Sequence, residues 1–358
     1  MRATAVGLVL ISHVCLFFPS ARGLFGCGLL AGYFGVELFF VLSGFLIGGI
    51  LLRELTQGDH RAPLLRFWQR RWLRTLPNYF LFLLINLALA AWLARELPTL
   101  LSYCLFLQNI TQRPPAFFVE SWSLAVEEWF YLLVPVLFLA ALKISSRHFQ
   151  RGSLLVICGV IVAVTLSRVA YVLATHPVWL TDVRMIVLYR LDACMFGVLG
   201  AWTKHFHPEQ WSRLRSWALP CGLLSLGLNA AVPFVAGTDS VFPQTFGFTM
   251  TSLGALLLLP SLDAWRAATG PLAATIVRIS IWSYSLYLAN LPVRTILVQA
   301  MPDSSNLFVA PLFVVCSVVV AAVVYRFYEQ PILAWRDQSR SENRCSHLPD
   351  TAAVLVKN

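Results

Sequence analysis

The chain has 358 residues, of which 58% are hydrophobic and 12% are charged, and its formal net charge is +10. Soluble globular proteins are about one-quarter charged, so this composition excludes a soluble enzyme. Apolar runs recur along the whole chain, which excludes a disordered chain and a nucleic-acid-binding module. Runs of about 17 to 25 residues can cross a hydrocarbon core of about 30 Å. The sequence therefore predicts a polytopic membrane protein.

Hydropathy predicts an all-α transmembrane helix bundle of about ten spans, at 3–19, 31–52, 75–94, 123–142, 153–174, 185–202, 217–236, 244–262, 279–299 and 307–325. The segment 97–110 is apolar but too short to cross, so we expect it at the outer surface or re-entering the membrane. Residues 1–336 form the predicted transmembrane domain. Residues 337–358 form a short polar tail that we expect to be cytoplasmic and disordered.

The positive charges are unevenly distributed between the two sides of this topology. Twenty of the 27 Lys and Arg residues fall on the side that holds both chain ends. Because cytoplasmic loops carry an excess of Lys and Arg, both termini are predicted to be cytoplasmic. The net charge is then explained by topology, and no nucleic-acid partner is expected.

Two features predict contacts between spans. Gly44 and Gly48 lie four residues apart in the second span, a spacing of small residues that lets helices approach closely. Arg190 and Asp192 are two residues apart, so on a helix they face different sides. We therefore expect each of them to pair with a residue elsewhere in the bundle.

His13 is the only histidine inside a predicted span. Counted from Arg2 at the inner interface, it lies about 16 Å into the membrane. A neutral imidazole is expected in apolar surroundings, where it can act as a general base for a hydroxyl nucleophile. A histidine that only hydrogen-bonds a neighbouring helix fits this position equally well.

The second candidate feature is an arginine cluster before the third span. Arg66, Arg70 and Arg74 share one helical face, and Arg71 lies beside Arg74. Guanidinium groups bind phosphates, and the two tryptophans in this segment offer stacking surfaces for a nucleobase, so a nucleotide-bearing cofactor fits here. A cytoplasmic loop is basic in most membrane proteins, and this alternative also explains the cluster.

Carboxylates form the third candidate feature. Glu127 and Glu128 lie at the outer start of the fourth span, and Glu127 is one turn from Tyr131. The helix dipole favours acids in a first turn, but one of two adjacent acids must face protein or a water-filled cavity. Glu37 is another acid inside a span, and it too must face protein or a water-filled cavity. It lies about 24 Å above Arg53, near the outer interface.

Taken together, these residues resemble the membrane-bound acyltransferase family 3, the O-antigen and exopolysaccharide O-acetyltransferases. The resemblance runs in order along almost the whole chain, through Arg2 with His13, the segment 35–45, Arg71 with Arg74 and Pro77, and the segments 122–131, 283–292 and 325–331. It implies transfer of an acyl group, commonly acetyl, from cytoplasmic acyl-CoA to a sugar hydroxyl. The acceptor would be a lipid-linked or surface glycan, such as lipopolysaccharide or exopolysaccharide, modified at the bacterial inner membrane.

The resemblance also implies roles for single residues. His13 would be the catalytic base, Arg71 and Arg74 would hold the CoA phosphates, and Glu127 and Glu329 would position the donor, the acceptor or the histidine. The expected site is then catalytic His13 and Glu127, donor-binding Arg70, Arg71, Arg74 and Glu329, and substrate-binding Glu37, Ser43, Trp122, Tyr131 and Asn290. No metal is expected.

Two positions depart from the family pattern. Asn290 stands where the family usually has a histidine, so it can hydrogen-bond but cannot be a base. Gln330 replaces the frequent arginine after Glu329, which weakens a possible phosphate contact.

Two alternatives from other classes stay open. A transporter or flippase for a glycan or an acyl-bearing lipid would use the same intramembrane charges, although no symmetric pair of interrupted spans is visible. An inactive subunit of an envelope assembly is compatible with the change at Asn290. The chain has no P-loop, no G-x-S-x-G and no H-E-x-x-H motif, which disfavours an ATP-driven pump, a serine hydrolase and a zincin.

Overall fold

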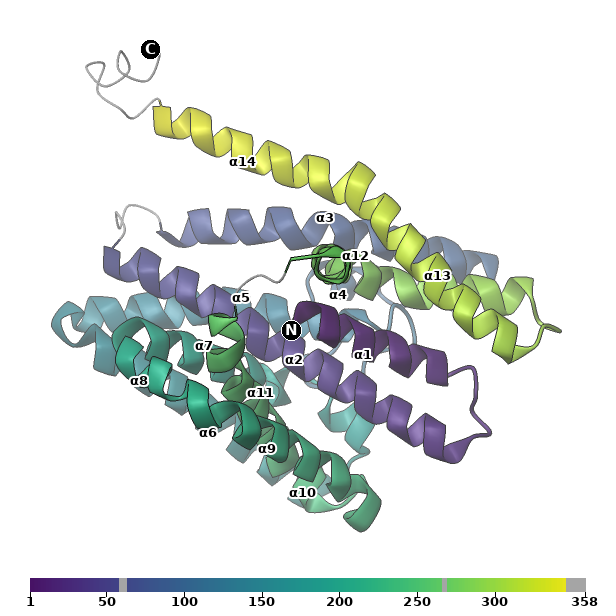
Figure 1. Ribbon diagram of the computed structural model, residues 1–358, viewed down its shortest axis with the longest axis horizontal. Helices are drawn as coiled ribbons and strands as arrows, with labels where there is room; N and C mark the ends of the chain where they lie inside the picture. Colours follow the sequence, from purple (N-terminus) through teal and green to yellow (C-terminus); the bar gives the residue numbers. More distant parts are fainter. Residues whose placement is uncertain (58–62, 266–268, 346–358) are drawn as a thin grey trace.

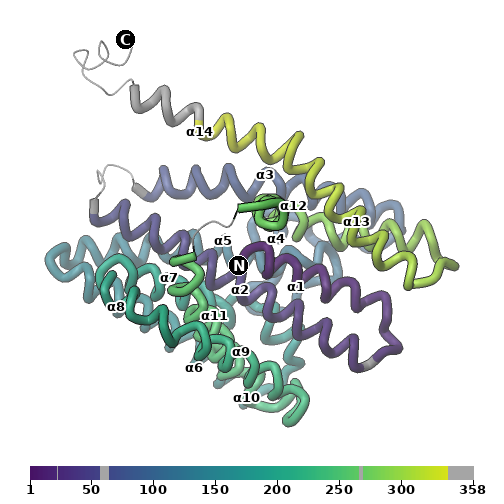
Figure 2. The backbone as a smooth tube through the Cα atoms, viewed as in Figure 1, coloured from purple at the N-terminus to yellow at the C-terminus, as the bar shows by residue number. Residues whose placement is uncertain are grey.

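A computed structural model describes residues 1–57, 63–265 and 269–345, and the protein in these ranges is helical, with no strand. The helices are α1 (Arg2–Cys15), α2 (Arg22–Gln57), α3 (Pro63–Trp92), α4 (Leu100–Cys104), α5 (Ser121–Ile144), α6 (Phe149–Thr175), α7 (Leu191–Phe206), α8 (Pro208–Arg213), α9 (Arg215–Ala236), α10 (Val241–Gln244), α11 (Phe246–Ala264), α12 (Pro271–Ala300), α13 (Asn306–Val324) and α14 (Gln330–Cys345). Short 3₁₀ or π turns lie at Ser146–His148, Trp179–Val183, Val187–Tyr189 and Tyr325–Glu329. Figure 1 and Figure 2 show the long helices running side by side.

The all-α membrane bundle is confirmed. Within the described residues, eight helices are long and apolar enough to cross a membrane: α2, α3, α5, α6, α9, α11, α12 and the helix that α13 begins. The expected number of ten also counted α1 and α7, which have 14 and 16 residues. Both are shorter than the roughly 20 residues that a full crossing needs. The ten spans and the cytoplasmic location of the termini therefore stay predictions.

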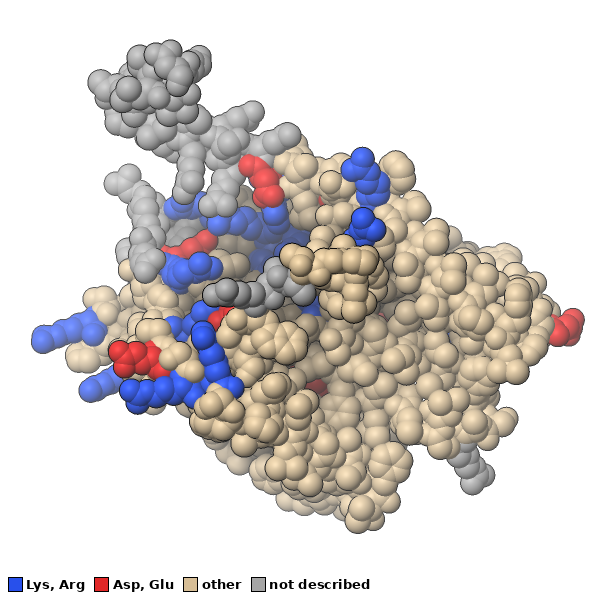
Figure 3. Space-filling model, viewed as in Figure 1, with Lys and Arg blue, Asp and Glu red and all other residues tan. Residues whose placement is uncertain are grey.

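Basic side chains are unevenly spread over the molecule. The face in Figure 3 shows Lys and Arg over its left and upper central parts, while its right end is almost free of them. This asymmetry agrees with the positive-inside bias of the sequence. The expected orientation, with the basic end in the cytoplasm, follows from this positive-inside bias and stays a prediction.

Helix boundaries differ from expectation at two places. The arginine cluster was expected in the connection 53–74, but residues 63–74 are the first turns of α3. Arginine has a high helix propensity, so a helix need not end where the hydrocarbon ends. Residues 337–345 were expected to be a disordered tail, but they belong to α14, which follows α13 and the turn Tyr325–Glu329 without a loop. An existing helix extends readily through such polar residues. Residues 346–358 lie outside the described residues.

The helix α2 is the axis of the bundle and packs closely on α1 and α7. At its crossing with α7, a Cβ atom added to Gly44 would lie 1.9 Å from the Cys194 carbonyl oxygen. On the facing helix, a Cβ on Gly197 would lie 2.0 Å from the Val41 carbonyl oxygen. The two backbones therefore touch at this crossing, as the glycine spacing in the second span predicts.

We expect Gly44→Ala to destabilise the protein by about 1–3 kcal/mol, because the new methyl group forces α2 and α7 apart. The thermal midpoint of the purified protein in detergent measures this effect. Gly49→Ala on the same helix is the matched control, since its Cβ would meet only the Ala201 Cβ, at 4.0 Å. Equal midpoints for the two variants would contradict the crossing described above.

Two buried ion pairs connect α2, α6 and α7. Arg190 pairs with Glu37, Arg168 pairs with Asp192 at 2.9 Å, and all four side chains are fully buried. The expectation that Arg190 and Asp192 find separate partners is confirmed. The helix α2 begins at Arg22, so Glu37 lies about 22 Å along a helix that is longer than the predicted span. Its location near the outer interface stays a prediction.

Candidate functional site

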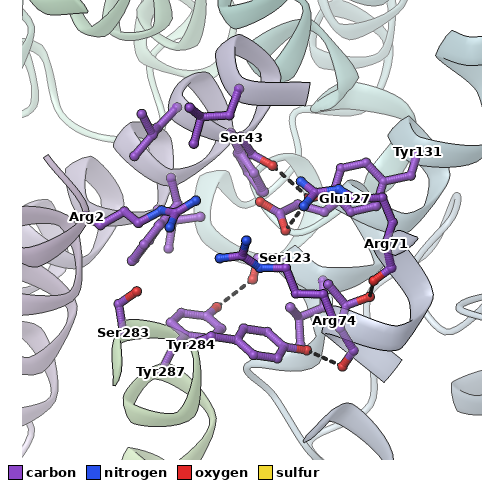
Figure 4. Close-up of a pocket in the computed structure, with 17 residues that line it drawn as sticks. Arg2, Ser43, Arg71, Arg74, Ser123, Glu127, Tyr131, Ser283, Tyr284 and Tyr287 are labelled. Carbon is purple, nitrogen blue, oxygen red and sulfur yellow. Dashed lines mark hydrogen bonds between the residues drawn. The ribbon is translucent and has the colours of Figure 1, made fainter. Parts of the chain in front are cut away.

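A cavity of about 790 Å³, including its open mouth, lies between α1, α2, α3, α5 and α12 (Figure 4). Its polar lining consists of Arg2, Ser43, Arg71, Arg74, Thr75, Ser123, Glu127, Tyr131, Ser283, Tyr284 and Tyr287. Its apolar lining consists of Val36, Phe39, Phe40, Leu42, Leu46 and Leu124. The expected site residues Arg71, Arg74, Ser43, Glu127 and Tyr131 thus meet in one place.

Three arginines project into this cavity. Arg2 reaches it from the first turn of α1, and Arg71 and Arg74 reach it from α3 (Figure 4). None of the three forms an ion pair with a carboxylate in the part of the chain that the structure describes. The three guanidinium groups share the cavity with one carboxylate, Glu127, and the positive charge that remains makes a binding site for an anion with several charges, such as a polyphosphate.

Arg70, expected to bind the donor, does not reach the cavity. Its guanidinium donates to a Glu54 carboxylate oxygen at 3.0 Å. Consecutive residues on a helix point about 100° apart, so Arg70 points away from the cavity that Arg71 lines. The sequence predicted donor binding by Arg70, Arg71 and Arg74, and it gave Arg2 no binding role.

Glu127 and Tyr131 form the acidic side of the cavity. The Tyr131 hydroxyl donates to Glu127 Oε2 at 3.1 Å and lies 2.7 Å from Ser43 Oγ. The Arg71 guanidinium lies 4.9 Å from the centre of the Tyr131 ring, a cation–π contact. The i, i+4 pairing of Glu127 with Tyr131 is confirmed.

The neighbouring acid, Glu128, faces protein instead. It is buried and accepts a hydrogen bond from Thr75 Oγ1 at 2.8 Å. The two adjacent acids are therefore divided as expected, one toward a cavity and one toward a hydroxyl. The sequence placed these acids on the outer side and the arginine cluster on the inner side. The structure brings them together, because Arg71 and Arg74 lie within a candidate spanning helix and line the same cavity as Glu127.

His13 does not line the cavity. It lies on the same face of α1 as Arg2, within about 20° around the helix and about 16 Å farther along it. Its Nδ1 lies 2.5 Å from Asn290 Oδ1 on α12. The contacts of Gly28 and Gly32 with Cys15 and Ser12 place this end of α1 beside the beginning of α2. Arg2 lines the cavity, so it does not mark the inner interface as the depth count assumed. The depth of His13 in the membrane stays a prediction.

Three other expected residues lie outside the cavity lining. Trp122 is buried against the Phe40 ring at 5.9 Å. Glu329 is buried and accepts hydrogen bonds from Asn78 at 2.9 Å and from Ser285 at 2.7 Å. Glu37 is held by Arg190, as described above. In the described ranges, no three His, Cys, Asp or Glu side chains are grouped so that they could hold a metal ion.

Comparison with known proteins gives consistent matches. The model of a family described as an acyltransferase domain matches residues 1–326. The chain is 26% identical to the peptidoglycan O-acetyltransferase OatA of Listeria monocytogenes, over 93% of this chain and 54% of that protein. It is 25% identical to the O-acetyltransferase OatA of Staphylococcus aureus, over 93% of this chain and 56% of that protein. The chain thus spans about half the length of these relatives. No solved structure matches it.

Proposed function

This chain belongs to the membrane-bound acyltransferase family 3, and we propose that it is an O-acetyltransferase that uses acetyl-CoA, or another acyl-CoA, to modify a glycan. The observation that carries the proposal is the position of Arg2 and His13 on one face of α1. Arg2 shares a cavity with two further arginines, and His13 lies three turns away. The relatives named above act on peptidoglycan or are O-acetyltransferases by name, so a hydroxyl of a lipid-linked or surface glycan is the proposed acceptor.

The cavity suits the phosphate-bearing end of the donor. Arg2, Arg71 and Arg74 offer charge-assisted hydrogen bonds to phosphate oxygens. The apolar wall that includes Phe39 and Leu46 suits the uncharged arm that follows the phosphates. The stretch of α1 between Arg2 and His13 is about 16 Å long, which is comparable to the reach of the pantetheine arm.

The reaction at the far end of the arm needs a base. His13 takes the proton of the acceptor hydroxyl while the hydroxyl oxygen attacks the thioester carbonyl carbon. A carbon–oxygen bond forms, the carbon–sulfur bond breaks, and the departing thiolate receives the proton from His13. Holding both reactants in one site supplies a further part of the rate.

The face of α1 between the two ends is closed in this structure. Val6 and Val9 lie on that face, and their exposed fractions are 1% and 3%. Passage of the arm therefore requires α1 to move relative to α2 or α12. This closed packing keeps the donor cavity separate from His13 until a donor enters.

Loss of a cavity arginine should weaken donor binding. We expect Arg71→Ala and Arg74→Ala to raise KM for acetyl-CoA about 10-fold or more, because a hydrogen bond to a charged group contributes about 1.5–3 kcal/mol. Transfer of radiolabelled acetyl groups from acetyl-CoA to candidate glycans, including peptidoglycan fragments, measures KM. Arg70→Ala is the matched control, since Arg70 pairs with Glu54 outside the cavity, and its KM should stay within about twofold of the wild type. The same KM for Arg70→Ala and Arg71→Ala would overturn the donor site.

A further inference from the structure

The Asn290 side chain is held in one orientation by its own helix. It is 1% exposed, and its Nδ2 donates to the carbonyl oxygens of Leu286 at 3.1 Å and Tyr287 at 2.8 Å. Both amide hydrogens are then used. The reversed orientation would place the amide oxygen against two carbonyl oxygens, and three acceptors cannot hydrogen-bond one another. The amide oxygen must therefore face His13.

This orientation decides which nitrogen of His13 carries hydrogen. An amide oxygen only accepts, so the contact of Asn290 Oδ1 with His13 Nδ1 requires a hydrogen on Nδ1. In a neutral imidazole the lone pair is then on Nε2. No residue that the structure describes hydrogen-bonds Nε2, and the His13 side chain is only partly buried. Nε2 is the nitrogen left for a substrate.

A second contact restrains the same part of α1. Arg294 lies one turn after Asn290 on α12 and donates to the Leu16 carbonyl oxygen at 3.1 Å. Leu16 lies three residues after His13, so α12 holds α1 both at the imidazole and one turn beyond it. The ring therefore has a fixed environment on its Nδ1 side.

We propose that Asn290 is a positioning residue that keeps His13 in the Nδ1–H tautomer and leaves Nε2 as its basic nitrogen. The inference rests on the proposed function for its catalytic meaning, because it assumes that His13 is the base. Asn290 does not touch the reacting atoms. It acts as the third group that orients a base, a role that other enzymes give to a carboxylate or an amide.

The tautomer can be measured without any assay of activity. In protein labelled with ¹⁵N-histidine, we expect the His13 signals, assigned by their loss in His13→Gln, to show a protonated Nδ1 and an unprotonated Nε2. Asn290→Leu should shift the population toward the Nε2–H tautomer. Asn290→Asp should keep the Nδ1–H tautomer with its carboxyl group protonated, because the O–H then donates to a helix carbonyl oxygen of Leu286 or Tyr287 and the other oxygen accepts from Nδ1. Asn229→Leu is the matched control, since Asn229 is another buried amide in a helix and bonds Thr251 instead.

Kinetics provide the second readout. We expect Asn290→Leu to lower kcat about 10- to 100-fold, less than the 10²- to 10⁴-fold that a general base contributes, with KM for acetyl-CoA within about twofold. Asn290→Asp should recover most of kcat. An Nε2–H tautomer in the wild-type protein, or an unchanged tautomer in Asn290→Leu, would overturn the inference. If the tautomers behave as expected and His13→Gln still transfers acetyl groups, the inference stands and the proposed base role fails.

Discussion

Replacing His13 with glutamine should abolish acetyl transfer, with a loss of at least about 100-fold in kcat, because a positioned general base contributes 10²- to 10⁴-fold. Glutamine keeps a polar group that can donate to Asn290 Oδ1, so the contact between α1 and α12 is retained while the basic nitrogen is lost. Transfer of label from saturating acetyl-CoA to a glycan acceptor measures the loss. Donor binding should be unaffected, since His13 does not line the cavity that holds the three arginines and lies about three turns of α1 from Arg2.

His176→Asn is the control for this prediction. His176 ends α6 in a left-handed conformation, with φ +47°, and asparagine tolerates this conformation better than most residues. That variant should keep wild-type transfer. Wild-type kcat in His13→Gln would remove His13 from the mechanism and return it to the alternative of a histidine that only links two helices.

Contacts within one helix were predictable from the sequence. The spacing of Glu127 and Tyr131 predicts their hydrogen bond, and the spacing of Arg190 and Asp192 predicts that they do not pair with each other. Both expectations follow from 3.6 residues per turn and need no knowledge of the neighbouring helices. The four-residue spacing of Gly44 and Gly48 likewise predicts a close helix crossing, although it does not identify α7 as the partner.

Depths in the membrane and contacts between distant helices were less predictable from the sequence. The depth of His13 was counted from Arg2, which was assumed to lie at the inner interface, whereas its side chain lines the cavity. The partner of Glu37 lies 153 residues away in the sequence, and no local pattern indicates such a pairing. Asn290 was correctly limited to hydrogen bonding, but that His13 is its partner emerged only from the packing of α1 against α12.

The departure at Asn290 supports an enzyme more than an inactive subunit. The alternative of an inactive envelope-assembly subunit drew on the loss of the usual family histidine at this position. In the structure, Asn290 contacts His13 and presents an acceptor to it. Asparagine at this position therefore still provides a hydrogen bond to the proposed base. Nor does a translocation path explain why three cavity arginines lack acidic partners among the described residues.

Breaking the buried ion pair between Arg190 and Glu37 should destabilise the protein by about 3–5 kcal/mol. Arg190→Met removes the guanidinium and leaves the Glu37 carboxylate fully buried, where the one hydrogen bond left to it among the described residues is the weak Ser252 hydroxyl contact at 3.4 Å. The double variant with Glu37→Met should recover most of the stability, because hydrophobic residues often replace a buried pair at no net cost. Thermal unfolding of the purified variants in one detergent measures each free-energy difference.

The ion pair between Arg113 and Asp182 offers the control, since the Arg113 side chain is 58% exposed and the pair is 2.8 Å long. Arg113→Ala should leave the thermal midpoint close to that of the wild type, and an equal change for Arg190→Met would contradict the burial argument. The double variant also decides the role of Glu37, which sequence reasoning assigned to substrate binding. If the stable double variant keeps acetyl transfer, Glu37 holds α2 against the N-terminal end of α7. If it is stable and inactive, the carboxylate serves the substrate as first expected.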